Sequence, residues 1–327
     1  MPRFLCLDCR RTCSRQTFST TYYLKRPALL ARVAAALLAC SAHRQIARSE
    51  LCAKTTVTRL AERLGRHALL FCAHVRSLAP SLIEPIVHDH FETFIGRQDR
   101  GLGIGTAVGS KSRFVVDVDP APHRGPGRRP DREPDARAWA ATHGAYVKSI
   151  SRTLSALIAR GRGEILLKAD GRRDYVAAIK KTGTASLIRL IAYPNPRRGP
   201  KGSPRSREAA ERDKAMGPVD QLHKMFRHSC ADHKRETIAF GRRLESSLGR
   251  AHLLAAWKNF IKRCNENSPL PTTPAMRQRL ADEPWTWQRI LNRRLFVAHE
   301  ALSPSELRLY EKRWTASLPP LALVNAG

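Results

Sequence analysis

Three aspartates in an acid-poor chain occupy positions that suit phosphodiester chemistry. Asp89 lies at or just before an expected strand, Asp170 ends another strand, and Asp220 begins a helical segment. Two strand-end carboxylates and one helix carboxylate can converge on two divalent ions, which activate a nucleophilic oxygen and stabilise a departing one. Mg²⁺ suits this arrangement because it prefers oxygen ligands. We take Asp89, Asp170 and Asp220 as candidate catalytic residues and Mg²⁺ ligands.

Each of these aspartates also has an ordinary structural explanation. Asp170 precedes Gly171, and an Asp-Gly pair after a strand commonly forms a turn. An aspartate that starts a helix, as expected for Asp220, commonly caps the free N–H groups of the first turn. Both explanations stay open beside the catalytic one.

A short helix, a tight connection and a longer basic helix follow one another between residues 41 and 66. Periodicity predicts helices over 28–38, 44–51 and 55–68. In a helix-turn-helix, the second helix presents polar residues near its N-terminus to base edges in the major groove. The connection lacks the common glycine, so a plain basic helical hairpin is the alternative. The candidate DNA-binding residues here are Arg44, Lys54, Thr55, Thr56, Thr58, Arg59, Arg63 and Arg66.

Two cysteines near the N-terminus have the spacing of a zinc knuckle. In Cys6-Leu-Asp-Cys9, the turn can aim both thiolates at one Zn²⁺, but a structural site needs four ligands. Cys13 is the nearest third candidate. We expect residues 1–20 to be a partial zinc-ribbon remnant with an incomplete Zn²⁺ site. The eight cysteines are scattered along the chain, which argues against a secreted disulfide scaffold.

The expected secondary structure is mixed. Strands are predicted over 91–95, 114–118, 164–168 and 186–192, a glycine-rich turn over 101–109, and helices over 138–159 and 175–181. Pro/Gly/Arg-rich segments at 120–134 and 194–206 are predicted to be exposed loops. Helices continue from there to near the C-terminus. Strands that alternate with helices predict an α/β core with helical appendages.

The net charge points to a polyanionic partner. The chain has 58 Lys+Arg against 28 Asp+Glu, a formal net charge of +30, and nucleic acid is the default partner of such a protein. The apolar stretch from Pro27 to Cys40 is interrupted by Arg32 and is too short to span a bilayer as a helix. We therefore expect a cytoplasmic protein that binds double-stranded DNA and no membrane.

Several stretches, in chain order, resemble insertion-sequence transposases of the zinc-ribbon, DDE type. Cys6-Leu-Asp-Cys9-Arg-Arg-Thr resembles the end of their ribbon, and His43-Arg-Gln-Ile-Ala with Lys54-Thr-Thr-Val-Thr-Arg-Leu resembles their helix-turn-helix. Asp89-His-Phe-Glu-Thr-Phe resembles the first-aspartate motif, and Asp170-Gly-Arg-Arg-Asp-Tyr175 resembles the second. Arg235-Glu-Thr-Ile-Ala-Phe-Gly-Arg resembles a block downstream of the third acid.

The resemblance implies an RNase H-like mixed-sheet catalytic core. It divides the chain into the ribbon remnant at 1–20, a helix-turn-helix module at 21–80, the core at 81–240 and a helical C-terminal region at 241–327. Counting back from the downstream block sets Asp220 on the third acid, usually Glu, and Arg227 on a DNA-contacting position. Glu236 is the alternative third ligand. The missing first knuckle is what an N-terminally truncated copy would show.

The function that the resemblance implies is DNA transposition. The protein would bind the ends of a mobile element and catalyse Mg²⁺-dependent phosphodiester hydrolysis and strand transfer, as a homo-oligomer on DNA near the bacterial nucleoid. Two alternatives stand beside it. One is a helix-turn-helix regulator that binds DNA without chemistry, and the other is an inactive, degenerate transposase copy. The departures from the family pattern, His90 after the first aspartate and Asp220 in place of Glu, leave the last alternative open.

Overall fold

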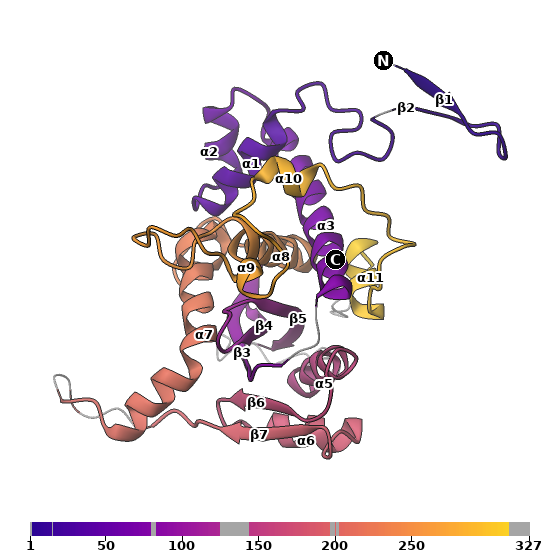
Figure 1. The fold of residues 1–327 in the computed structure, drawn as a ribbon. Helices are drawn as coiled ribbons and strands as arrows, with labels where there is room; N and C mark the ends of the chain where they lie inside the picture. Colours follow the sequence, from indigo (N-terminus) through magenta and orange to yellow (C-terminus); the bar gives the residue numbers. More distant parts are fainter. Residues whose placement is uncertain are drawn as a thin grey trace, which may run out of the picture.

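One five-stranded mixed sheet forms the centre of the protein (Figure 1). The computed structural model describes residues 2–14, 16–79, 83–124, 144–196, 200 and 203–313. The strand order is β5-β4-β3-β6-β7; β4 runs antiparallel to both β3 and β5, and β6 and β7 run parallel to β3. The mixed α/β class is confirmed. The strands are β3 (Ile86–Ile95), β4 (Arg97–Gly109), β5 (Val115–Arg124), β6 (Ile165–Ala169) and β7 (Ile188–Ala192).

The glycine-rich stretch that was expected to form a turn is instead the long strand β4. Its glycines at 101, 103 and 105 alternate, so they lie on one face of the sheet. A Cβ at Gly105 would lie 3.0 Å from Ser149 Oγ and 3.1 Å from His90 Nε2. The glycines therefore make room for side chains that cross this face. The prediction of a turn was wrong because glycine serves close packing here as well as tight turns.

Alternation along β3 divides its side chains between two helical layers. Phe91 packs on Phe226 of α7 with ring centroids 5.1 Å apart, and Asp89 faces the same side. His90 points to the opposite side, where its Nε2 lies 3.2 Å from Ser149 Oγ of α5. Helix α6 packs beside α5 (Figure 1). These helices are α5 (Ala145–Ile158), α6 (Arg173–Thr182) and α7 (Arg207–Ser229).

Helix α7 corrects the expected position of Asp220. The helix begins well before Asp220, with Ser206 as its N-cap: the Ser206 hydroxyl accepts a hydrogen bond from Ala209 N at 3.2 Å. It then continues through Pro218, a residue that usually interrupts helices because it lacks an N–H. The sequence therefore suggested a helix start at Asp220 that does not exist, and Asp220 does not act as a helix cap.

The expected exposed loop at 120–134 is partly strand. Pro120 and Pro122 pair with Ile104 and Leu102 as part of β5. Because β5 is an edge strand, a proline in it removes no hydrogen bond that a further strand would need. Residues 125–134 lie outside the described part of the chain. In the second expected loop, 194–206, the described residues before α7 have no helix or strand.

Four helices pack above the sheet in Figure 1. The two longest, α3 and α8, cross where Gly65 meets Gly249: a Cβ at Gly65 would lie only 2.8 Å from Gly249 Cα. The absence of side chains at both positions lets the two backbones touch. The four helices are α1 (Leu29–Leu38), α2 (His43–Ser49), α3 (Lys54–Leu78) and α8 (Leu244–Phe260).

Helix α8 also continues the hydrogen bonding of the sheet edge. The Asn259 side chain donates from Nδ2 to Val115 O at 2.9 Å and accepts at Oδ1 from Val115 N at 2.8 Å. Its neighbour Lys258 donates to Arg113 O. The amide thereby replaces a missing neighbouring strand for β5. Because α8 packs on both α3 and the sheet, the expected boundary at 240/241 is no break in packing.

The remaining elements are short. An N-terminal hairpin extends away from the body in Figure 1, and the C-terminal helices lie against α1, α3 and α8. Among the described residues, no helix has the length and apolar character needed to cross a membrane. These elements are β1 (Arg3–Leu5), β2 (Thr12–Ser14), η1 (Ala231–His233), α9 (Pro274–Arg277), α10 (Trp287–Leu291) and α11 (Pro304–Tyr310).

Candidate functional site

Two of the three candidate acids lie level on adjacent strands. Parallel pairing sets Val87 of β3 opposite Lys168 of β6. Continuing that register by two residues places Asp170, just past the end of β6, level with Asp89 and on the same face. Neighbouring strands are about 4.8 Å apart. Asp89 therefore lies within β3 rather than before it, and Asp170 is the first residue after β6.

Crowding and burial change the charge state of Asp89. Burial of its carboxyl group, and then the nearby carboxylate of Asp170, raise the pKa of Asp89 to about 7. Asp220 raises it further, while a hydrogen bond from His90 N at 2.8 Å and the charge of Arg212 oppose the change. All three candidate acids are therefore in one electrostatic environment.

Asp220 reaches this environment from α7, but its carboxylate is already paired. Arg212, two turns earlier on the same helix, bonds both oxygens of Asp220, with Nη2 3.3 Å from Oδ1. The alternative third acid, Glu236, is exposed in the segment after η1. The structure thus places Asp220 beside Asp89, held back by an arginine, and places Glu236 on the surface.

A histidine of α7 completes the immediate surroundings of Asp89. The Thr106 hydroxyl donates to Asp89 O at 3.2 Å and lies 3.0 Å from His223 Nε2. Since that hydroxyl uses its proton on the carbonyl, its oxygen accepts Nε2–H, which leaves Nδ1 of His223 without a proton. This Nδ1 faces Asp89 Oδ2 at 3.8 Å. Burial lowers the pKa of His223 to about 3, so the imidazole is neutral.

The donor set fits a divalent cation at two positions and not at the third. Asp89 and Asp170 supply carboxylate oxygens, and Mg²⁺ is commonly held by one or two carboxylates with waters and substrate phosphates. Asp220 is engaged by Arg212. In the described part of the chain, no three His, Cys, Asp or Glu side chains lie close enough together to hold a metal. The expected three-acid cluster is therefore not closed in this structure.

Sequence reasoning missed a layer of polar side chains on the opposite face of β3. The Tyr175 hydroxyl donates to His88 O at 3.0 Å and accepts from His88 Nδ1, 2.9 Å away. Burial lowers the pKa of His88 to about 3, so it is neutral. The only sequence signal is the alternation of His88 and His90 around Asp89. Tyr175 thus links α6 to the strand that carries Asp89.

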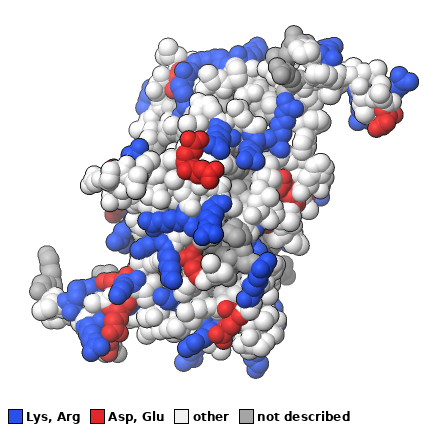
Figure 2. Space-filling model, viewed as in Figure 1, with Lys and Arg blue, Asp and Glu red and all other residues white. Residues whose placement is uncertain are grey.

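Arginine and lysine side chains surround these acids. Arg227 stacks over the Phe91 ring, 4.7 Å from its centroid, and desolvation lowers its pKa. Lys168 is partly exposed two residues before Asp170. Figure 2 shows Lys and Arg spread widely over the face in view, with smaller patches of Asp and Glu among them. This surface suits a phosphodiester backbone.

The region predicted to be a helix-turn-helix does contain two helices, but several of its candidate DNA-binding side chains make contacts within the protein. Leu51 adopts a left-handed conformation, φ +48°, in the connection where glycine is usual. Arg63 donates to Thr20 O and Tyr22 O at 2.9 and 2.8 Å, and Thr58 bonds His43 Nδ1 at 3.0 Å. These side chains hold the chain together. Partly or fully exposed are Arg44, Lys54, Thr55, Thr56, Arg59 and Arg66.

The N-terminal hairpin turns tightly between Cys6 and Arg10. Arg10 is left-handed, φ +57°, and its N–H bonds Cys6 O at 2.9 Å. Hydrogen bonds from Cys9, backbone first, lower the pKa of Cys6. Cys13 lies opposite Phe4 in the hairpin and is exposed. Cys6 and Cys9 are thus joined by hydrogen bonds, and among the described residues no third potential ligand joins them.

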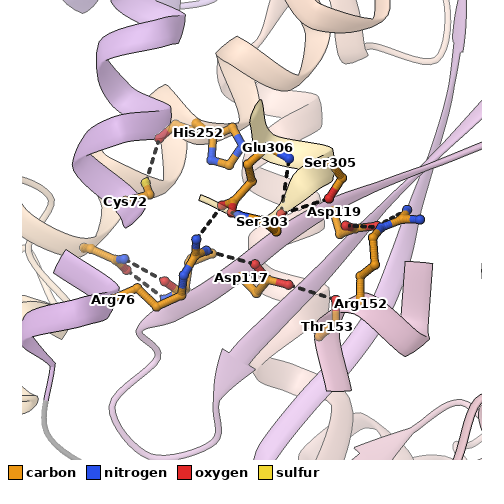
Figure 3. Close-up of polar contacts among 12 residues, drawn as sticks. Cys72, Arg76, Asp117, Asp119, Arg152, Thr153, His252, Ser303, Ser305 and Glu306 are labelled. Carbon is orange, nitrogen blue, oxygen red and sulfur yellow. Dashed lines mark hydrogen bonds and ion pairs between the residues drawn. The ribbon is translucent and has the colours of Figure 1, made fainter. Parts of the chain in front are cut away.

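A second charged cluster is buried where α3, α5, α11 and β5 meet (Figure 3). Arg76 lies between Asp117 Oδ1 at 3.2 Å and Glu306 Oε1 at 2.5 Å. Thr153 donates to the other oxygen of Asp117 at 2.9 Å. Burial raises the pKa of Asp117, and Arg76 opposes that change. Arg76, Asp117 and Glu306 are thus paired with one another, and the cluster joins four elements.

No protein-family model matches the sequence, and no curated protein matches it. The function therefore has to be argued from the arrangement of residues in this chain.

Proposed function

We propose that this protein is a DNA transposase, or a close derivative of one, with Asp89 and Asp170 at the catalytic centre. The observation that carries the proposal is the register that sets these two acids level on adjacent parallel strands, with Asp220 close enough to raise the pKa of Asp89. Like charges gathered in a strongly basic chain are expected where a cation is to be held.

The fold supports the same proposal. Three antiparallel strands followed by two parallel ones, in the order β5-β4-β3-β6-β7, are consistent with an RNase H-like core. In that interpretation β3 carries the first acid, the end of β6 the second, and α7 the third. The family resemblance of the two aspartate motifs adds to this geometry.

In this proposal, the acids of the site would bind the cation and the basic residues would bind the DNA. With Mg²⁺ bound at Asp89 and Asp170, the site would gain the positive charge that stabilises a departing phosphodiester oxygen. Asp89 would bind as the anion, so it gives up the proton that its raised pKa favours. Arg227 and Lys168 would bind phosphates of the DNA and orient the strand. Asp220 would join as a third ligand once it separates from Arg212.

The second candidate is a DNA-binding protein without catalysis, which includes an inactive transposase copy. The observation that favours it is the pairing of Asp220 with Arg212, since a paired carboxylate is a poor metal ligand. This candidate keeps the basic surface and α2–α3 as its DNA-binding parts. It predicts salt-dependent DNA binding that needs no metal.

A strand-cleavage and strand-transfer assay with Mg²⁺ separates the candidates. On DNA carrying inverted repeats identified on either side of the gene by sequencing, the wild type should cleave and Asp170→Ala should lose at least 99% of the activity, about the 10²-fold or more typical of a lost catalytic group. Asp99→Ala, which removes an exposed acid paired with Arg97, is the matched control and should keep full activity. Equal activity in wild type and Asp170→Ala would exclude the proposed mechanism.

A further inference from the structure

A groove of about 790 Å³ separates the helices α2 and α3 from residues 238–250. Its floor is the crossing of α3 and α8, where Gly65 and Gly249 bring the backbones into contact. One wall is a single face of α3, whose lining residues Lys54, Thr58 and Arg66 are spaced by multiples of four. The face expected to read DNA as a convex helix surface therefore lines a concave site.

The opposite wall is held in place by the sheet. Gly96, at the end of β3, donates from its N–H to Gly241 O at 2.7 Å, and the Phe240 ring lies 6.1 Å from that of Phe94. The wall is therefore attached to the strand that carries Asp89. Gly96 is seven residues beyond Asp89, roughly 23 Å along an extended strand.

Charge in the groove is unbalanced after its ion pairs are counted. Glu62 pairs with Lys312 at 2.6 Å, and Asp232 pairs with Arg250 at 2.8 Å. Among the lining residues this leaves Glu245 as the one unpaired acid. Five exposed basic side chains of the lining have no acidic partner in the described structure: Arg44, Lys54, Arg66, Arg242 and Arg243.

The groove is also lined by apolar side chains, which phosphate binding alone would not require. Ile238 is fully exposed, at 101% of its reference area, and Phe240 is partly exposed, while the buried Leu69 also belongs to the lining. Cations at the margin with apolar and aromatic side chains below them are what single-stranded nucleic acids bind, because phosphates take the cations and unpaired bases take the apolar surface. A duplex keeps its bases stacked inside and would leave this surface uncovered.

We infer that this groove binds a single strand of DNA, next to the end of β3, the β-strand that carries Asp89. The inference rests on the proposed function, since strand cleavage produces the unpaired end that would lie here. The duplex ends of an element would be bound elsewhere on the basic surface. Arg242 and Arg243 would bind the phosphates, and Ile238 and Phe240 would contact the bases.

The test is fluorescence anisotropy of the full chain in EDTA with a labelled oligothymidylate of about 12 nucleotides, within the usual site size for such grooves, and with a duplex of equal length. The wild type should bind both, the single strand in the groove and the duplex elsewhere on the basic surface. Arg242→Glu/Arg243→Glu should weaken single-strand binding about tenfold or more. The slope of log affinity against log salt concentration should become shallower by about 0.7 per lost phosphate contact.

Lys180→Glu/Lys181→Glu is the control variant. It makes the same charge change at two adjacent exposed residues of α6, at the opposite end of the molecule from α2 in Figure 1, and should bind the single strand as the wild type does. Ile238→Ser, at a fully exposed position, should weaken single-strand binding without lowering thermal stability.

Two results would overturn the inference: a groove variant that binds the single strand like the wild type, or one that loses duplex binding as much as single-strand binding. Because binding is measured without metal, these results are independent of catalysis. Loss of binding in the groove variant together with an absence of Mg²⁺-dependent cleavage would leave the groove assigned and reject the transposase proposal.

Discussion

Asp170 lies level with Asp89, two residues beyond the register pair Val87–Lys168 on adjacent parallel strands. This relationship brings together two residues 81 positions apart in the chain. It also adds to the raised pKa of Asp89: burial is the larger cause, and a second carboxylate nearby further opposes ionisation of the first. A bound cation would reverse that effect.

Removing Arg212 should strengthen cation binding. Arg212→Ala frees the Asp220 carboxylate and removes a positive charge from the neighbourhood of Asp89. We expect Mg²⁺ affinity, measured by isothermal titration calorimetry, to rise by roughly tenfold, which corresponds to about 1.4 kcal/mol. Arg207→Ala, which breaks an exposed pair with Glu211 on the same helix, should leave the affinity unchanged. Unchanged binding in Arg212→Ala would count against Asp220 as a ligand.

Removing Arg76 should destabilise the fold strongly. Arg76→Met leaves Asp117 and Glu306 buried at the junction without their cation, and breaking a buried pair in this way costs about 3–5 kcal/mol. Urea unfolding followed by circular dichroism measures the loss. Arg97→Met, which breaks the exposed pair with Asp99, is the control and should cost less than about 1 kcal/mol. A similarly small effect for Arg76→Met would show that the cluster is not needed.

Adding one methyl group at the α3–α8 crossing should also be costly. The Cβ of Gly65→Ala would meet the backbone of Gly249, which cannot move aside as a side chain can. We expect a loss of roughly 1–3 kcal/mol from overpacking, although alanine has the higher helix propensity by about 1 kcal/mol. Thermal unfolding measures the change. Ser246→Ala, at an exposed position of α8, is the control. If Gly65→Ala were as stable as Ser246→Ala, the close contact between the two helices would be contradicted.

Lys258 should make stability depend on pH. Burial lowers the pKa of Lys258 to about 7, whereas it is about 10.4 in an unfolded chain. As pH falls from about 10 to 7, the unfolded state takes up the proton first, so folding is progressively disfavoured, and the penalty is complete below pH 7.

Replacing this lysine tests that sign. The stability of Lys258→Met relative to wild type should improve by roughly 3 kcal/mol between pH 10 and pH 7, measured by urea unfolding at both values. Lys262→Met, at the more exposed lysine that pairs with Glu266, should show no such trend. A difference between Lys258→Met and wild type that is the same at both pH values would contradict the lowered pKa.

Local patterns determined much of the secondary structure. The spacing of Val57, Leu60 and Leu64 predicted a helix, and all three are buried on one face of α3. The apolar runs at 164–168 and 186–192 predicted strands, which are β6 and β7. These signals succeed because helix and strand periodicity are properties of neighbouring residues.

The errors arose where a residue serves a distant partner. The glycines of β4 resemble a turn until the side chains of His90 and Ser149 are seen to fill the space above Gly105. Pro218 and Asp220 resemble a helix start, but α7 already begins after the Ser206 cap and continues through Pro218 to pack on β3 and β4. These packing partners are distant in the sequence.

The sequence by itself determined the strong positive charge, the class of fold and the identity of the strand-end acids, because composition and periodicity are written along the chain. Only the tertiary structure decided that Asp89 and Asp170 lie level on adjacent strands, that Arg212 forms an ion pair with Asp220, and that the basic face of α3 lines a groove. Those facts depend on strand register and helix crossing. Both are set by contacts between residues far apart in sequence, such as Gly65 and Gly249.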